Sequence, residues 1–447
     1  MTRSELRAGA ALASVFGLRM LGLFMVLPVL SLYVRELPGG DSLSWAGVAL
    51  GAFALTQALF QIPYGLASDR WGRKPVIVAG LLLFAFGSGL AAWAPTIEWL
   101  IAARVLQGAG AISAAVSALA ADLTREQHRT KVMAMIGASI GVVFAVSLVA
   151  APALYASVGM PLMFAGIAGL ALLAILVVWR VVPDPVAPPN DSGPLPLWPV
   201  LSDGQLWRLN FGIFVKHLTQ IALFLVVPRL LVDLHGMPAG RHWQLYLPVV
   251  LVSFVLMAPV IVVAEKRGWI RQVLLCCICL LAVSQLLLIV GYTDFWLLAA
   301  ALLVFFVAFN ILEASLPALV SRMAPAGTRG FALGAFNTAQ ALGAGCGGAL
   351  GGWLAMHHGP RAVFIAALVL MLVWLVWARS MRVPPLSDQR EYALPPEVDV
   401  RTARDEISRL PGVREVAVEP ERRVARLKIN PERWDERVML RYIGGEA

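Results

Sequence analysis

Residues 65–77, GLASDRWGRKPVI, place four charged side chains close together in a chain that is otherwise poor in charge. They are Asp69, Arg70, Arg73 and Lys74, whereas only 14% of the 447 residues are charged and 59% are hydrophobic. Soluble domains are roughly half apolar and about a quarter charged. The composition is that of a membrane protein, so we expect this stretch in a loop between two membrane spans.

Apolar runs on both sides of the loop are long enough to cross a bilayer. A helix of about 20 residues rises about 30 Å, which is the thickness of the hydrocarbon core. The sequence therefore predicts an all-α polytopic membrane protein with twelve transmembrane helices in two six-helix bundles. The predicted spans are 9–34, 45–67, 75–93, 98–121, 131–157, 160–182, 207–233, 242–264, 270–291, 294–320, 329–356 and 360–382.

The domain organisation follows from composition and from an internal repeat. The segment 183–206 is too rich in Pro, Asp and Asn to continue a helix. LASDRWG at 66–72 has a counterpart in VVAEKRG at 262–268, and such repeats are typical of transporters whose substrate path lies between two halves. We predict an N-terminal bundle (1–182), a cytoplasmic linker (183–206), a C-terminal bundle (207–383), a second linker (384–396) and a cytoplasmic α+β domain (397–447).

Basic residues set the predicted orientation. If both termini lie in the cytoplasm, the segments outside the membrane carry three basic residues, Arg35, Arg241 and Arg361. The cytoplasmic segments then carry the excess of Lys and Arg, as the positive-inside rule expects. The tail 397–447 has equal numbers of acids and bases, so the net charge of +9 belongs to the membrane part. It reports topology and indicates no nucleic acid partner. The first apolar stretch is too long for a signal-peptide core, so no cleavable signal is expected.

The tail alternates between two kinds of pattern. Ala403, Ile407 and Leu410 recur at helical spacing, and Trp434, Val438 and Tyr442 mark a second helix. Between them, VREVAVEPERRVARLKI predicts a strand hairpin. The four cysteines lie elsewhere, at Cys276, Cys277, Cys279 and Cys346, without metal-ligand spacing. We therefore predict that the protein binds no metal ion and needs no cofactor.

Three motifs resemble the major facilitator superfamily. GLASDRWGRK at 65–74 resembles its signature loop, RVLQG at 104–108 its fourth-span motif, and LRMLGLFMVLPVL at 18–30 the first span of its drug:proton antiporters. Some members carry a small ferredoxin-like domain after the twelfth span, and the resemblance implies such a domain at 397–447. The resemblance implies the major facilitator fold and alternating access.

The resemblance also implies a conformational latch in the charged loop. In the family, the aspartate matching Asp69 meets the start of the eleventh helix, here near 328–330, when the transporter faces outward. The arginine matching Arg73 pairs with an acid at the cytoplasmic end of span four, where Asp122 stands. Free amides at a helix start attract an anion. The expected latch residues are Gly65, Asp69, Arg70, Gly72, Arg73, Lys74 and Asp122.

Five ionisable residues stand out within the predicted spans, Arg19, Arg104, Lys216, His217 and Glu313, and a buried charge costs at least about 2.5 kcal/mol there. Lys216 and Glu313 are each roughly 10–15 Å from the cytoplasmic face at a rise of about 1.5 Å per residue, so they could pair. Glu313 is then the preferred proton carrier, and a purely structural ion pair is the alternative. The resemblance implies that Arg104 takes part in proton coupling. The alternative is that Arg104 is a packing residue whose guanidinium is hydrogen-bonded to carbonyl groups. Arg19 is either a substrate contact or structural, and His217 either titrates or is only hydrogen-bonded.

Function follows as a set of alternatives. No nucleophile, base or metal constellation points to an enzyme, and no phosphate-binding loop points to ATP. We expect a monomeric, proton-driven exporter of small amphipathic molecules in a bacterial inner membrane, with Gln57, Gln61 and Asn310 as possible substrate contacts. Ala151 stands before Pro152 where related antiporters have glycine, which weakens export relative to import. The alternatives are an importer of a sugar or organic acid, and a membrane sensor.

Overall fold

The computed structural model describes residues 3–40, 42–124, 126–184, 198–324, 328–382, 388–395, 398–419, 423–429 and 433–443. The chain forms two compact units. The larger unit comprises Met1–Ile261 and Gln272–Met381, and the smaller one Val262–Arg271 and Arg382–Ala447. Most of the predicted linker 183–206 lies outside the described residues, and its end forms the short helix α8 (Trp198–Leu201).

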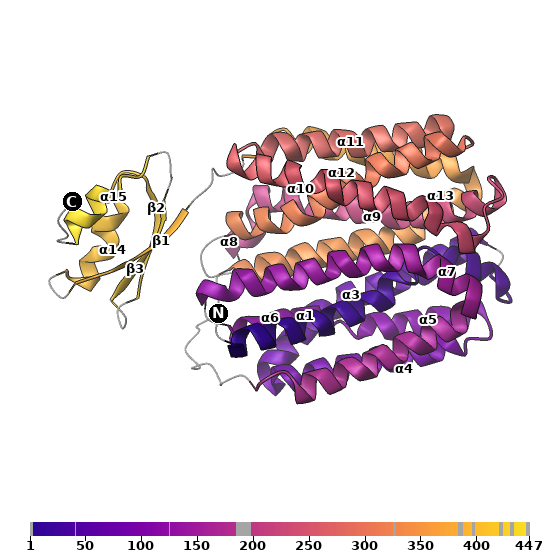
Figure 1. Cartoon of the computed structure of the whole chain (residues 1–447), viewed down its shortest axis with the longest axis horizontal. Helices are drawn as coiled ribbons and strands as arrows, with labels where there is room; N and C mark the ends of the chain where they lie inside the picture. The colour runs from indigo at the N-terminus through magenta and orange to yellow at the C-terminus, as the bar shows by residue number, and fades with distance from the viewer. Residues whose placement is uncertain are drawn as a thin grey trace. The chain divides into compact units, whose positions relative to one another are not determined.

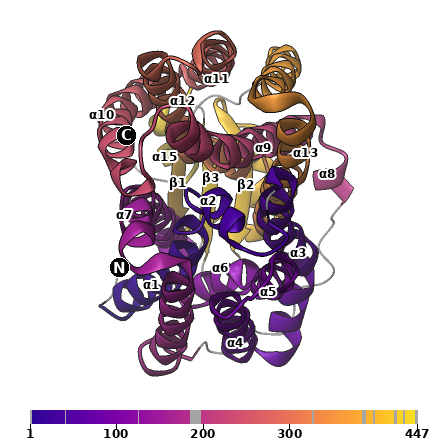
Figure 2. The ribbon, with the colours of Figure 1, turned by 90° about the vertical axis from the view of Figure 1, so that its right-hand side faces the viewer.

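Long helices run side by side through the larger unit (Figure 1). Within the described ranges, ten are long and apolar enough to cross a membrane, with α5 and α6 counted together. Figure 2 shows α1, α4, α5 and α6 on one side of this unit and α10, α11 and α12 on the other. The long helices are α1 (Arg3–Phe24), α3 (Leu43–Trp71), α4 (Arg73–Ala92), α5 (Ile97–Ala109), α6 (Ser113–Asp122), α7 (Glu126–Arg180), α9 (Gly204–Asp233), α10 (Trp243–Lys266), α11 (Ile270–Gly291), α12 (Phe295–Met323) and α13 (Arg329–Ala378).

The two longest helices are each interrupted at one glycine. In α7, Gly159 has φ 73° and ψ 165°, and in α13, Gly359 has φ 77° and ψ 174°. Glycine is the residue that adopts positive φ without a steric penalty. Both glycines lie where the sequence predicts one span to end and the next to begin. We call the helices up to α7 the first half and those from α9 to α13 the second half.

Two predicted spans are not continuous helices. The first ends as α1 at Phe24, passes through a turn at 25–29 that contains Pro28, and resumes as α2 (Leu30–Tyr33). The fourth breaks at 110–112, between α5 and α6. Neither 9–34 nor 98–121 is therefore one unbroken helix, although Ile97–Ala120 still has the length and composition of a single span. The spans were predicted from their length and apolar composition, and these do not reveal where the backbone leaves the helical conformation.

Helix α13 packs closely against both halves. A Cβ at Gly348 would lie 2.5 Å from the carbonyl oxygen of Gly47 in α3, and one at Gly347 would lie 2.2 Å from that of Leu218 in α9. Only glycine permits such approach, as in other tightly packed membrane helices. The glycine-rich run at 343–352 thus brings a second-half helix into backbone contact with the first half.

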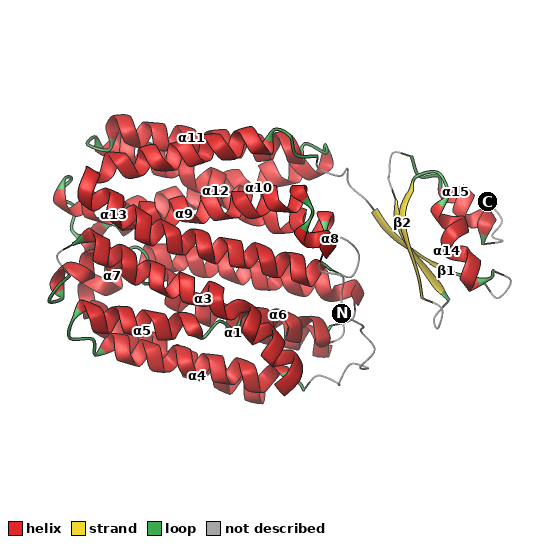
Figure 3. Cartoon of the chain, turned by 180° about the vertical axis from the view of Figure 1, so that it is seen from behind, coloured by secondary structure: helices red, strands yellow, loops and turns green. Residues whose placement is uncertain are grey.

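The smaller unit is a three-stranded antiparallel sheet with two helices. The strands β1 (Asp388–Ala393), β2 (Val413–Glu419) and β3 (Val424–Ile429) have the order β1-β3-β2. Figure 3 shows these strands in the smaller unit together with α14 (Val400–Ser408) and α15 (Glu436–Tyr442). The buried core includes Ala403, Ile407, Ala425, Leu427, Ile429 and Met439.

Strand β1 is a correction to the sequence analysis, which assigned 384–396 to a linker. The strand reads DQREYA, and its buried member is Tyr392, which lies opposite Ala425 of β3. Such a polar run lacks the alternation that marks a half-buried strand. Pairing with β3, a contact distant in sequence, decides its conformation.

The hydrogen bond between Tyr442 and Glu406 predicts a loss of stability at high pH. The hydroxyl donates to Glu406 Oε2 at 2.6 Å. Desolvation, followed by this bond and the carboxylate charges, raises the pKa of Tyr442 to about 12. Because the pKa of this group is higher in the folded state than in the unfolded state, where it is about 10, the hydroxyl stabilises the folded state fully below about pH 10. This stabilisation is lost as the pH rises through about 12.

We therefore expect the smaller unit of the wild type to lose resistance to urea between pH 10 and 12, and Tyr442→Phe to lose less. The 19F signal of fluorotryptophan at Trp434, which packs against this core, reports its unfolding in the full chain. Assignment uses Trp434→Phe. Parallel pH curves for the wild type and Tyr442→Phe would contradict the prediction.

Candidate functional site

Lys216 and Glu313 form an ion pair between α9 and α12. The ammonium of Lys216 donates to Glu313 Oε2. The lysine side chain is fully buried, whereas 36% of the glutamate side chain is exposed. Counting depth along the predicted spans suggested this pairing, and the structure brings the two groups together. The acid is the member that remains open to another partner.

His217 and Gln340 complete this ionic site. His217 Nδ1 lies 3.2 Å from the carbonyl oxygen of Ile213, so we assign its proton there. His217 Nε2 then accepts from the amide of Gln340 at 2.8 Å and lies 3.7 Å from Glu313 Oε2. Gln340 comes from α13, so three helices converge on the site. Sequence analysis missed it, although a glutamine inside an apolar span was an available signal.

Three polar residues, Gln57, Gln61 and Asn310, were predicted as possible substrate contacts, and their side chains are buried or half-buried. Asn310 Nδ2 donates to Ser253 Oγ of α10 at 2.9 Å, and its side chain is buried. Gln61 is also buried, and its Oε1 lacks a hydrogen-bond partner among the described residues. Gln57 is half-buried. Asn310 lies one turn before Glu313 on α12, and in the part of the chain that the structure describes no hydrogen bond joins these three side chains to the ionic site.

Arg104 is held inside the first half by neutral groups. Its Nη1 donates to Gln107 Oε1 at 2.7 Å, its Nε to the Ala49 carbonyl at 3.4 Å, and its guanidinium lies 4.4 Å from the Phe53 ring centroid. Gln107 in turn donates to Ser88 Oγ at 2.8 Å. Within the described ranges no carboxylate pairs with Arg104. Its charge is dispersed over an oxygen network and a ring face.

Arg19 supports the break in span four. Its Nε donates to the carbonyl of Gly110 at 3.3 Å and its Nη1 to Ser113 Oγ at 3.2 Å. Gly110 ends α5 and Ser113 begins α6. The last carbonyls of a helix have no partner within it, so a guanidinium here satisfies groups that the break exposes. Of the two alternatives for Arg19, these contacts describe the structural one.

In the charged loop, Arg73 lies between two helices. Its Nε is 2.8 Å from Asp122 Oδ2, at the end of α6, and its Nη1 donates to Ser68 Oγ at 2.8 Å. Lys74 pairs with Asp184 at 2.7 Å. Gly72 separates α3 from α4 with φ 94°, a conformation that favours glycine.

Two further latch residues, Gly65 and Arg70, are described. Gly65 lies against Ala114, with 3.7 Å between its Cβ position and that of Ala114, and Arg70 is exposed. The side chains of Asp69 and of residues 329–330 lie outside the described residues. The expected contact of Asp69 with the start of the eleventh span therefore stays a prediction.

The two halves are joined at the end where α3 begins and α9 ends. Arg35 donates two hydrogen bonds of 2.7 Å to Asp233, and Arg229 donates to the carbonyl of Ser31 at 2.8 Å. Ser44 Oγ donates to the carbonyl of Gly352 at 3.3 Å. We call these contacts the seal. Arg35 and Asp233 were not predicted as functional, although opposite charges at adjacent span ends were a usable signal.

The hydrogen bonds and ion pairs that join the two halves lie, among the described residues, at the sealed end. The part-exposed Glu313 lies nearer the C-terminal end of α12, and this helix runs away from the seal.

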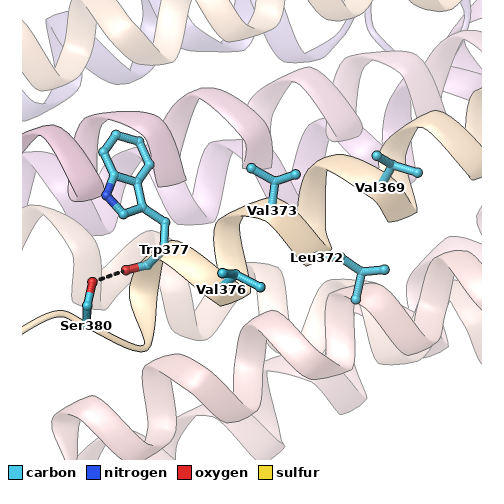
Figure 4. A pocket seen from close by; sticks show the side chains of 6 residues that line it. All are labelled: Val369, Leu372, Val373, Val376, Trp377 and Ser380. Carbon is cyan, nitrogen blue, oxygen red and sulfur yellow. Dashed lines mark hydrogen bonds between the residues drawn. The ribbon is translucent and has the colours of Figure 1, made fainter.

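A separate groove of about 600 Å³ lies along the end of α13 (Figure 4). It contains none of the charged residues above. Its side chains are largely exposed and apolar, as expected for a helix face that contacts lipid. The groove is lined by Val369, Leu372, Val373, Val376, Trp377 and Ser380.

Two helical halves that are joined at one end, with a part-exposed ionic site among the helices of the second half, are the architecture of a membrane transporter. Residues 12–272 and 251–440 match the family described as Major Facilitator Superfamily. The chain belongs to the major facilitator superfamily. It is a multi-pass membrane protein with a small-molecule substrate, and the prediction that it is not an enzyme is confirmed.

Individual relatives agree with this assignment. The inner membrane transport protein YajR of Escherichia coli (strain K12) is 42% identical over 435 residues, which are 96% of this chain and 95% of the relative. Multidrug resistance protein MdtH of Edwardsiella ictaluri is 27% identical over 394 residues, 83% of this chain and 93% of the relative. A bacterial homolog of the human lysosomal transporter Spinster, solved in an inward-facing and occupied conformation, shares the fold with a TM-score of 0.69 at 14% identity, covering 85% of this chain and 97% of the solved one.

The Arg35–Asp233 pair predicts a measurable effect on the balance between conformations. Its side chains are 42% and 45% exposed, and exposed pairs contribute about 0.2–1 kcal/mol. Asp233→Asn should therefore shift the ratio of sealed to unsealed molecules by up to about fivefold. Pulsed EPR distances between spin labels at Pro38→Cys and Leu234→Cys, in a chain without its native cysteines, measure this ratio.

The charge-swapped double variant, Arg35→Asp with Asp233→Arg, should restore the wild-type distribution, because it re-forms the pair in reverse. If the single and double variants gave the same distribution, the pair would have no role in the seal.

Proposed function

We propose that this protein is a proton-coupled secondary transporter that exports small amphipathic compounds by alternating access. The observation that carries the proposal is the part-exposed carboxylate of Glu313, which lies between Lys216 and His217. A carboxylate at membrane depth must be neutralised by a cation or by a proton. Lys216 neutralises it in this conformation, and a proton can do so when Lys216 is displaced.

The topology we propose has twelve spans. The chain reverses at Gly159 and at Gly359, so that α7 and α13 each supply two crossings. Both termini lie in the cytoplasm of a bacterial inner membrane, and the seal faces outward. The structure then corresponds to an inward-open state. The smaller unit is a ferredoxin-like domain, a proposal supported by its β1-β3-β2 order and two helices.

Export of amphipathic compounds is supported by the similarity to a protein named for multidrug resistance. The competing candidate is proton-coupled import, which Ala151 before Pro152 favours. The direction of the pH effect separates the two. An exporter releases lumenal protons from acid-filled inside-out vesicles when substrate is added outside, whereas an importer moves protons and substrate in the same direction.

We expect substrate-induced proton release to fall at least tenfold in Glu313→Gln and in Arg104→Ala. Glu313→Gln removes the titrating group, and Arg104→Ala removes the buried charge that the family resemblance ties to coupling. Inside-out vesicles with an acid interior, challenged with lipophilic cations, dyes, antibiotics and sugars, provide the assay. Glu98→Gln is the matched control, because Glu98 is an exposed carboxylate in the first turn of α5. Proton release by Glu313→Gln at the wild-type rate would refute the role of Glu313.

We also expect Asp69→Asn to slow transport severalfold while leaving insertion and thermal stability unchanged. A neutral amide interacts more weakly than a carboxylate with the positive end of a helix. Turnover in proteoliposomes measures the effect, with Trp71→Phe, at an exposed position of the same loop, as a control for disturbance of the loop. Turnover at the wild-type rate in Asp69→Asn would exclude the latch.

A further inference from the structure

The ring of Phe309 contacts both the ionic site and a ring of the first half. The Lys216 ammonium nitrogen is 3.9 Å from its centroid, and the His217 ring is 5.7 Å away. The ring of Phe144 is 6.1 Å away at an interplanar angle of 32°. Phe309 is 3% exposed, so it is enclosed by these neighbours.

Phe144 enters this region from the first half. It belongs to α7, whereas its aromatic neighbours Phe224, Phe306 and Phe309 belong to α9 and α12 of the second half, at 6.4, 6.1 and 6.1 Å. Phe24 of α1 lies 5.1 Å from it, in an edge-to-face arrangement. We call Phe144 and its second-half neighbours the aromatic plug. It joins the halves through ring contacts, which are specific in geometry.

The position of the Lys216 ammonium depends on the state of Glu313. In the structure the ammonium has two attractive neighbours, the Glu313 carboxylate and the electron-rich face of Phe309. When a proton or a substrate neutralises Glu313, the carboxylate loses its attraction for the ammonium and the ring face becomes the stronger partner. His217 and Gln340 also face Glu313, but His217 is held by the Ile213 carbonyl and by Gln340.

We propose that Phe309 is a positioning residue that couples the ionic site to the separation of the halves. A shift of the Lys216 ammonium toward the ring moves Phe309 against Phe144 and loosens the aromatic plug. Close-packed interiors transmit such displacements instead of absorbing them. The inference rests on the proposed function, because it assigns a route from the neutralisation of Glu313 to the conformational change.

The first test compares the number of protons moved per substrate in proteoliposomes. Phe309→Leu removes the ring face, Phe309→Tyr keeps it, and Phe305→Leu is the matched control. Phe305 is a fully buried ring of the same helix that stacks on Phe309 at 5.6 Å, and its described ring contacts are with Phe306 and Phe309. We expect the ratio to fall at least fivefold in Phe309→Leu and to stay at the wild-type value in Phe309→Tyr and Phe305→Leu.

The second test measures opening of the seal without transport. Val34 is fully buried in the 3-10 helix next to Arg35, so Val34→Cys in a chain without native cysteines reports access to a membrane-impermeant maleimide. The rate at each pH is divided by that of the exposed Leu234→Cys in the same background, which cancels the ionisation of the thiol. We expect this ratio to change severalfold with pH in the otherwise wild-type chain. Phe309→Leu should remove this dependence, and Phe144→Leu should raise the rate at every pH. Phe309→Met, which retains most of the volume, replaces Phe309→Leu if that variant does not fold.

The outcomes separate the inference from the proposed function. If the wild type is proton-coupled and Phe309→Leu behaves like Phe305→Leu in both tests, the inference is overturned and the proposed function stands. If neither the flux nor the labelling of the wild type responds to pH, the proposed function fails and the inference fails with it. Loss of coupling in Phe309→Leu with recovery in Phe309→Tyr supports the inference.

Discussion

The need to neutralise a charge within the membrane governs the arrangement of the second half. Lys216 is fully buried and lies against Glu313 and the face of Phe309, so its charge is offset by an acid and a ring. Glu313 is part-exposed and can exchange this partner for another. The two members of the pair are therefore unequal. With a buried base and an accessible acid, neutralisation of the acid changes the forces that act on the base.

The first half neutralises its charges in a different way. Arg19 and Arg104 donate to carbonyl, amide and hydroxyl oxygens, and Arg104 also lies over a ring. A guanidinium has five N–H donors in a rigid fork, so it can be satisfied by several neutral acceptors at once. Such cations fix helix positions, as Arg19 does at the break between α5 and α6. The halves share a repeated loop motif in sequence, but their buried charges have different surroundings.

Local rules predicted what is regular in this molecule. Helical rise allowed Lys216 and Glu313 to be placed at one depth, and the loop motif located Arg73 opposite Asp122. The misses depend on contacts distant in sequence. Strand β1 is polar and is defined by its pairing with β3, the break at 110–112 is stabilised by Arg19, and Phe144 and Phe309 are indistinguishable in sequence from other phenylalanines in apolar spans.

The individual contacts at the seal and in the aromatic plug are weak, which is consistent with a protein that must visit two conformational states. An exposed ion pair such as Arg35–Asp233 contributes about 0.2–1 kcal/mol, and an aromatic pair about 0.5–1.5 kcal/mol beyond its buried area. Every 1.4 kcal/mol changes a population ratio tenfold, so a seal of many kcal/mol would trap the sealed state. Contacts of this size can be outweighed by a change at one buried ion pair. The backbone contact between Gly47 and Gly348 adds proximity without side chains that must be unpacked, which lets α3 and α13 separate and rejoin at low cost.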